Sequence, residues 1–150
     1  MIGRLIGVDH GRKRIGLAIS DALGLSAREH AILQSRGEAE DFAAILAIAK
    51  RENAAGIVVG VPQNPNAPPD IKTQADVVRE WIARLRSISP LPIVEVSEYL
   101  TSEEARSLAR QLKRSPRDAI DDLAARVILQ AYLDALSYGS ATFPPSESSV

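Results

Sequence analysis

The chain has 150 residues, of which 45% are hydrophobic and 25% are charged, and its formal net charge is −1. These values are typical of one soluble globular domain and argue against a general polybasic coat for nucleic acid, although a local basic groove stays compatible with them. The absence of cysteine excludes disulfides and thiolate metal sites. We see no secretory leader and no apolar run that could cross a bilayer, so we expect a cytoplasmic protein with no membrane partner.

The first predicted elements are two strands joined by a tight turn. Residues 5–9 form an apolar run that ends in the carboxylate of Asp9, and Gly11 permits the turn. Ile15 and Leu17 then alternate with small residues, as expected of a strand. An acid at the end of a central strand is costly to bury alone, so a cation is expected to share its site. The alternative is that Asp9 only caps the turn.

The middle of the chain alternates between helix and strand, as judged from its apolar periodicity and its turn-rich segments. In chain order we predict a strand over residues 28–33, a helix over 38–53, a strand over 56–61, a loop over 62–69, a helix over 70–87 and a strand over 92–96.

Two helices are predicted next. Thr101 and Glu104 have capping-box spacing, which predicts a helix to about residue 113, and Ser115 as N-cap predicts a second helix over 115–138. Residues 139–150 are rich in Ser and Pro, and we expect them to be a disordered tail after a domain over residues 1–138. A three-strand meander followed by crossover units indicates an α/β fold, with one mixed sheet and helices on both faces.

Three acids from distant parts of the chain are candidates for one site. Ligands of open α/β sheets gather at the carboxyl ends of the strands, where Asp9 ends the first strand and Glu98 follows the last. Asp121 shares a helical row with apolar residues and should point toward the sheet. The polar row of the same helix should face water, with an ion pair between its first two members; it consists of Asp122, Arg126, Gln130 and Asp134.

Such a trio suggests a site for one or two divalent ions, which can support phosphodiester cleavage. Because the chain has only two histidines, carboxylate oxygens would dominate the site, which favours Mg²⁺ or Mn²⁺ over zinc. Two alternatives stay open: Glu98 is a solvated turn acid, or Asp121 pairs with a lysine or arginine.

Several segments resemble the YqgF/RuvX family, pre-16S rRNA nucleases once called Holliday-junction-resolvase-like proteins, of the RNase H-like fold. The segments are GVDHGRKRIGLA at residues 7–18, followed by Ser20 and Asp21; IVVGVP at 57–62, followed by Asn64; DDLAA at 121–125, followed by ILQAYLD at 128–134; and, more weakly, SEYLTSEEA at 97–105. Together they span nearly everything before the predicted tail.

The resemblance implies a five-stranded sheet of order 3-2-1-4-5 and a metal-dependent nuclease. It implies catalytic and metal-binding roles for Asp9, Glu98 and Asp121. Residues expected to contact nucleic acid are Arg12, Lys13, Arg14, Asn64 and Tyr99. The family usually has Asp-Glu-Arg where this chain has Ser97-Glu98-Tyr99, so one acid and one cation are missing, and Tyr99 would either stack on a base or pack against the protein. The loop also lacks the family's glycines, with Ala67-Pro68-Pro69 in their place.

The leading functional hypothesis is a nuclease that processes the 5′ end of pre-16S rRNA, with Mg²⁺ or Mn²⁺ as cofactor. Its partners would be structured RNA and ribosomal precursor particles, and the protein would be a monomer or a homodimer. One alternative is resolution of branched DNA, which requires a two-fold dimer. Others are a non-catalytic nucleic-acid-binding assembly factor and an ATPase of the actin and sugar-kinase type, for which 150 residues supply only one of the two required domains.

Overall fold

The structure is a computed structural model, and it describes residues 2–63, 68, 70–98, 101–115 and 117–145, with only the backbone of residues 98 and 101–103. The described residues form five strands and four helices. In chain order these are β1 (Leu5–His10), β2 (Arg14–Ser20), β3 (Ala27–Gln34), α1 (Glu38–Arg51), β4 (Gly56–Pro62), α2 (Gln74–Ile88), β5 (Ile93–Glu98), α3 (Thr101–Gln111) and α4 (Asp121–Ser137).

The strands form one mixed sheet of order β3-β2-β1-β4-β5, which confirms the predicted topology. β1 pairs antiparallel with β2, and β2 pairs antiparallel with β3. β4 runs parallel to β1 and β5 runs parallel to β4, so the carboxyl ends of β1, β4 and β5 lie at one edge. That edge carries Asp9 and Glu98.

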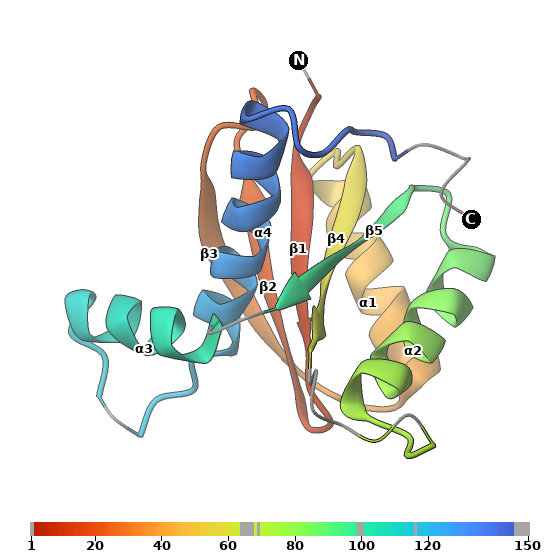
Figure 1. Cartoon of the computed structure of the whole chain (residues 1–150), viewed down its shortest axis with the longest axis horizontal. Helices are drawn as coiled ribbons and strands as arrows, with labels where there is room; N and C mark the ends of the chain where they lie inside the picture. Colours follow the sequence, from red (N-terminus) through yellow and green to blue (C-terminus); the bar gives the residue numbers. More distant parts are fainter. Residues whose placement is uncertain (1, 64–67, 69, 99–100, 116, 146–150) are drawn as a thin grey trace.

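The sheet is covered on both faces, as Figure 1 shows, with α4 on one face and α1 and α2 on the other. Alternation along β1 divides its side chains between two cores. Ile6 and Val8 belong to the cluster that includes Phe42 of α1 and Ile82 of α2, whereas Leu5 belongs to the cluster under α4. A third, smaller cluster lies between α3 and α4, where Ala105 and Ala109 of α3 pack with Leu123 of α4.

Helix α2 begins four residues later than the sequence prediction at Asp70. Its N-cap is Thr73, whose side chain accepts a hydrogen bond from the backbone N–H of Asp76 while Asp76 accepts one from the backbone N–H of Thr73. This capping box satisfies two backbone donors that a helix start at Asp70 would leave to other partners.

Helix α4 begins at Asp121, so the prediction that Ser115 is its N-cap is wrong. Ser115 and Asp118 instead close a turn: the backbone N–H of Ser115 donates to Asp118 Oδ2 at 2.8 Å, and the N–H of Asp118 donates to the Ser115 carbonyl at 3.0 Å. Ser115 and Asp118 are residue types that favour a helix start, but here the Asp118 side chain accepts a backbone hydrogen bond within a local turn.

The chain after α4 returns across the sheet (Figure 1). The Tyr132 hydroxyl donates to the Thr142 carbonyl at 2.7 Å, and Phe143 packs against Gly56 at the start of β4. These contacts hold residues 142 and 143 on the domain, beyond the predicted boundary at residue 138. Residues 146–150 of the predicted tail lie outside the described residues.

Among the described residues, no helix combines the length and the apolar character needed to span a bilayer.

Candidate functional site

Asp9 lies near the carboxyl end of β1, on the strand face that α4 covers. Leu5 packs under α4, and a Cβ atom added at Gly7 would lie 2.7 Å from the Cβ of Leu129 in α4. Asp9 follows Gly7 at the two-residue spacing that keeps strand residues on one face. Its backbone pairs directly with Gly16 of β2.

Gly16 brings the first turn of α4 next to Asp9. A Cβ atom added at Gly16 would overlap the carbonyl oxygen of Asp121 and would lie 2.8 Å from the backbone nitrogen of Asp122. Any side chain at position 16 would therefore push the helix off the strand. Because Asp9 is the cross-strand partner of Gly16, two of the three predicted acids are held on neighbouring pieces of backbone.

The Asp121 side chain lies against the sheet, as expected, and it pairs with Arg14 of β2. Arg14 Nε donates to Asp121 Oδ2 at 2.9 Å, and the two side chains are 44% and 21% exposed. The pairing of Asp121 with an arginine, which the sequence left open, is therefore present in the structure. An ion pair that water reaches from one side contributes little stability, so a divalent ion can compete for this carboxylate.

The position predicted for Asp122 is wrong. Its side chain does not face water beside Arg126 but is 11% exposed and binds Arg114 through both oxygens, at 2.8 and 3.0 Å. Arg126 instead lies 3.4 Å from Glu29 of β3, and Arg114 lies 3.9 Å from the same carboxylate. The hydrogen bonds with Asp122 raise the pKa of Arg114, so this cation is a fixed charge at any physiological pH.

The third predicted acid, Glu98, is the last residue of β5, where its backbone pairs with Pro62 of β4. The predicted nucleic-acid contacts Asn64 and Tyr99 lie outside the described residues, as does the side chain of Glu98. Among the side chains that the structure describes, no three or more His, Asp or Glu groups come together as a metal site, and Glu98 is not part of that set. The convergence of all three acids stays a prediction.

The turn between β1 and β2 carries two further predicted contacts, Arg12 and Lys13, and both are exposed. His10, beside Asp9, lies on the other face of β1, where its ring centroid is 4.7 Å from that of Trp81 in α2. Burial lowers the pKa of His10, against the opposing effect of the Asp41 carboxylate, so the ring is neutral at neutral pH. His10 is therefore a packing residue and not a ligand beside Asp9.

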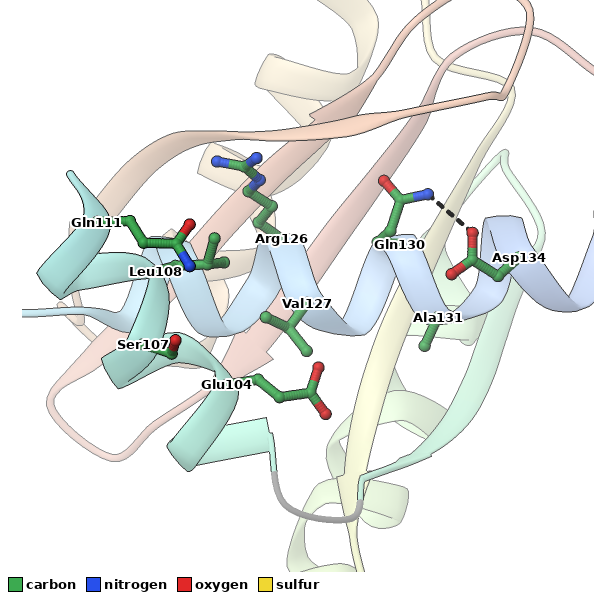
Figure 2. Close-up of a pocket in the computed structure, with 9 residues that line it drawn as sticks. All are labelled: Glu104, Ser107, Leu108, Gln111, Arg126, Val127, Gln130, Ala131 and Asp134. Atoms are coloured by element: carbon green, nitrogen blue, oxygen red, sulfur yellow. Dashed lines mark hydrogen bonds between the residues drawn. The ribbon is translucent and has the colours of Figure 1, made fainter.

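A groove of about 410 Å³ lies between α3 and α4 on the outer side of the molecule. Figure 2 shows its lining: Glu104, Ser107, Leu108, Gln111, Arg126, Val127, Gln130, Ala131 and Asp134. Gln130 Nε2 donates to Asp134 Oδ1 at 3.0 Å along the α4 wall of the groove. None of the predicted site residues whose side chains the structure describes, Asp9, Arg12, Lys13, Arg14 and Asp121, lines this groove.

Sequence reasoning missed two residues that shape this edge. Gly16 could have been found, because a glycine within an alternating strand signals close approach of another backbone. Arg114 could not, because nothing in its local sequence indicates that Asp122, eight residues later, is its partner.

Comparison with known proteins relates the chain as a whole to nucleases. Residues 3–135 match the RuvX family model, described as "Holliday junction resolvase". A protein of a Synechococcus species, named "Putative pre-16S rRNA nuclease", is 39% identical over 132 residues, covering 86% of this chain and 87% of the relative. A protein of the same name from Anaeromyxobacter dehalogenans is 40% identical over 134 residues, covering 87% of this chain and 96% of the relative.

Two solved structures share the fold. RuvC of T. thermophilus in complex with a Holliday junction substrate aligns with a TM-score of 0.62 and 13% identity, covering 91% of this chain and 97% of that one. The Fowlpox virus resolvase in complex with Holliday junction DNA aligns with a TM-score of 0.52 and 14% identity, covering 89% and 98%. These likenesses assign the RNase H-like fold to the chain.

Proposed function

Because this chain belongs to the RuvX family, we propose that it is a divalent-metal-dependent nuclease that processes the 5′ end of pre-16S rRNA. The family and the fold support nuclease chemistry, and the names of the relatives support an rRNA precursor as substrate. The structural observation that carries the proposal is the contact of Gly16 with the first turn of α4, which holds the backbones of Asp9 and Asp121 at one edge of the sheet.

The residues at this edge fit a hard divalent cation. Asp9 and Asp121 supply carboxylate oxygens, the donors that Mg²⁺ and Mn²⁺ prefer. The backbone of α4 packs directly on Gly16. Asp9 on β1 and Asp121 on α4 therefore lie on elements that are fixed relative to each other. We assign the third ligand to Glu98, which follows Val96 of the α4-side cluster by two residues in β5.

In this proposal the ion, when bound, supplies activation of water and stabilisation of the leaving oxygen. Asp9 and Asp121 hold and orient it from two elements. Arg14 pairs with Asp121, and because an ion on that carboxylate would compete with it, Arg14 would then be available to the substrate phosphates. Arg12 and Lys13, exposed on the same turn, would position the backbone of the strand to be cut.

The test is cleavage of a 16S rRNA precursor by purified protein with Mg²⁺ or Mn²⁺. Wild type should cleave near the mature 5′ end, and Asp9→Asn should be inert while keeping the melting temperature of the folded protein. Asp134→Asn is the matched control, because Asp134 is an exposed acid on the same helix as Asp121, and it should cleave like wild type. If wild type and Asp9→Asn have the same activity, the proposal is wrong.

A four-way DNA junction belongs in the same assay, because the family model is described as a junction resolvase. If the junction is the preferred substrate and its cleavage is also lost in Asp9→Asn, the proposed metal site would be supported, but the substrate would be branched DNA and not rRNA.

A further inference from the structure

The segment 106–117 concentrates positive charge in an otherwise balanced chain. Its twelve residues include five Arg or Lys and no Asp or Glu, whereas the whole chain has a formal net charge of −1. The five are Arg106, Arg110, Lys113, Arg114 and Arg117. The stretch covers the second half of α3 and the turn that leads to α4.

The fold gathers three of these charges around one hollow beside α3. A hollow of about 380 Å³ is lined by Arg106, Arg110 and Arg114, with Ser115 and Asp118 at its end. The three arginines are spaced four residues apart, the spacing of neighbours on a helix surface. The backbone N–H of Arg114 donates to the Ala109 carbonyl at 2.9 Å, which keeps Arg114 next to the end of α3. Among the described residues, the lining thus carries three cations and one anion, and one of the cations, Arg114, is paired with Asp122 beside the hollow.

The other side of the same helix has the opposite character. The groove between α3 and α4 in Figure 2 is lined by two acids, Glu104 and Asp134, and one cation, Arg126, which lies 3.4 Å from Glu29. The charge is therefore sorted across α3 rather than scattered, which is the pattern of a surface that meets an extended anion on one side.

The basic side is also joined to the candidate active site. Arg114 binds Asp122, and the neighbouring Asp121 binds Arg14, the first residue of β2. The first turn of α4 thus binds two arginines: Arg114 lines the hollow, and Arg14 begins β2 directly after the exposed turn that carries Arg12. A polyanion crossing the acids at this edge would meet cations both before and after them.

We propose that the basic segment 106–117, through its exposed cations Arg106, Arg110, Lys113 and Arg117, binds the phosphodiester backbone of the nucleic-acid substrate beside the cleavage site. The inference rests on the proposed function in taking a nucleic acid as the substrate, and it adds where the uncut part of the strand lies. Such contacts are electrostatic and independent of sequence, and binding releases counterions, so affinity falls steeply with salt.

The experiment measures binding of a labelled RNA stem-loop with a single-stranded 5′ extension, in EDTA so that no cleavage occurs, over a range of salt concentrations. Arg106→Gln/Arg110→Gln should lower the slope of log affinity against log salt by about 2 and weaken binding roughly tenfold at about 0.1 M salt. The matched control is Lys50→Gln/Arg51→Gln, which removes the same charge from exposed positions of α1 on the opposite face of the sheet and should bind like wild type.

A second variant, Lys113→Gln/Arg117→Gln, changes two exposed cations of the same segment and should give the same loss, which guards against misfolding of the first. Equal affinities and slopes for all three double variants, or no RNA binding by wild type, would overturn the inference. Cleavage is scored separately. If wild type cleaves RNA but the slopes of the 106/110 and 113/117 variants equal that of wild type, only the proposed binding surface is refuted. If wild type does not cleave but these variants have lower slopes, the nuclease proposal is refuted and the binding surface is supported.

Discussion

Gly16 and Asp121 lie so close that a Cβ atom on the glycine would overlap the carbonyl oxygen of the aspartate. This contact joins a strand to the start of a helix more than a hundred residues later. It also explains the small residues of β2 that face α4: Ala18, two residues after Gly16, belongs to the cluster under the helix. The position of Asp121 relative to Asp9 therefore depends on residue 16 being a glycine, which has no side chain.

Replacing that glycine should displace α4. We expect Gly16→Ala to lower the free energy of unfolding by about 3 kcal/mol, at the upper end of overpacking costs, because the new atom meets backbone and not a flexible side chain. Urea denaturation measures the loss. Stability within about 0.5 kcal/mol of wild type would show that the helix is not seated on the strand as described.

The ion pair between Arg114 and Asp122 should be structural. Asp122→Asn removes one partner of a mostly buried bidentate pair, and we expect a loss of about 2 kcal/mol, below the cost for a fully buried pair since water still reaches Arg114. Asp134→Asn removes an exposed acid of the same helix and should cost less than about 0.5 kcal/mol. Equal losses in chemical denaturation of the two variants would argue against the pair.

The capping box of α2 should make stability depend on acid pH. Hydrogen bonds from the backbone N–H and then the hydroxyl of Thr73 lower the pKa of Asp76 below its ordinary value of 3.8. Because the folded-state pKa is the lower one, the unfolded chain takes up the proton first, so this stabilisation is complete well above pH 3.8 and is lost as the pH falls through the folded pKa. The melting-temperature difference between wild type and Asp76→Asn should therefore shrink from about pH 6 to about pH 3. A constant difference would contradict this account.

The segment after α4 should contribute to stability. Deleting residues 139–150 removes the Phe143 ring from Gly56 and the hydrogen bond from Tyr132 to Thr142, and we expect a loss of about 2 kcal/mol. Deleting only residues 146–150 is the control and should cost less than about 0.5 kcal/mol. If both deletions unfold at the same urea concentration as wild type, the folded domain ends at residue 138, as the sequence suggested.

The sheet could be predicted because its signals are local. The apolar run of β4, the alternation of β2 and the glycine between β1 and β2 each specify a strand or a turn without reference to distant residues. The strand order was implied by the family resemblance rather than by periodicity, and the observed order confirms it.

The errors arose where two local signals compete or where a distant residue decides. The pattern predicts that α2 starts at Asp70, whereas the capping box of Thr73 and Asp76 starts it at Gln74. The side chain of Asp122 could not be placed from a helical wheel, because α4 is covered by the sheet on one side and by Arg114 on another. The approach of Asp121 to Gly16 likewise depends on tertiary packing, although the row containing Asp121 correctly indicated the sheet side.

The central claim is that Asp9, Glu98 and Asp121 hold a divalent ion, and the anomalous scattering of a crystal soaked in Mn²⁺ tests it most directly. The account predicts a peak bound by carboxylate oxygens of all three residues at roughly 2.0–2.3 Å, with the Arg14 side chain no longer on Asp121. The same soak of Asp9→Asn should lose the peak. A wild-type crystal in which Mn²⁺ is absent from this edge while Asp121 still binds Arg14 would contradict the account.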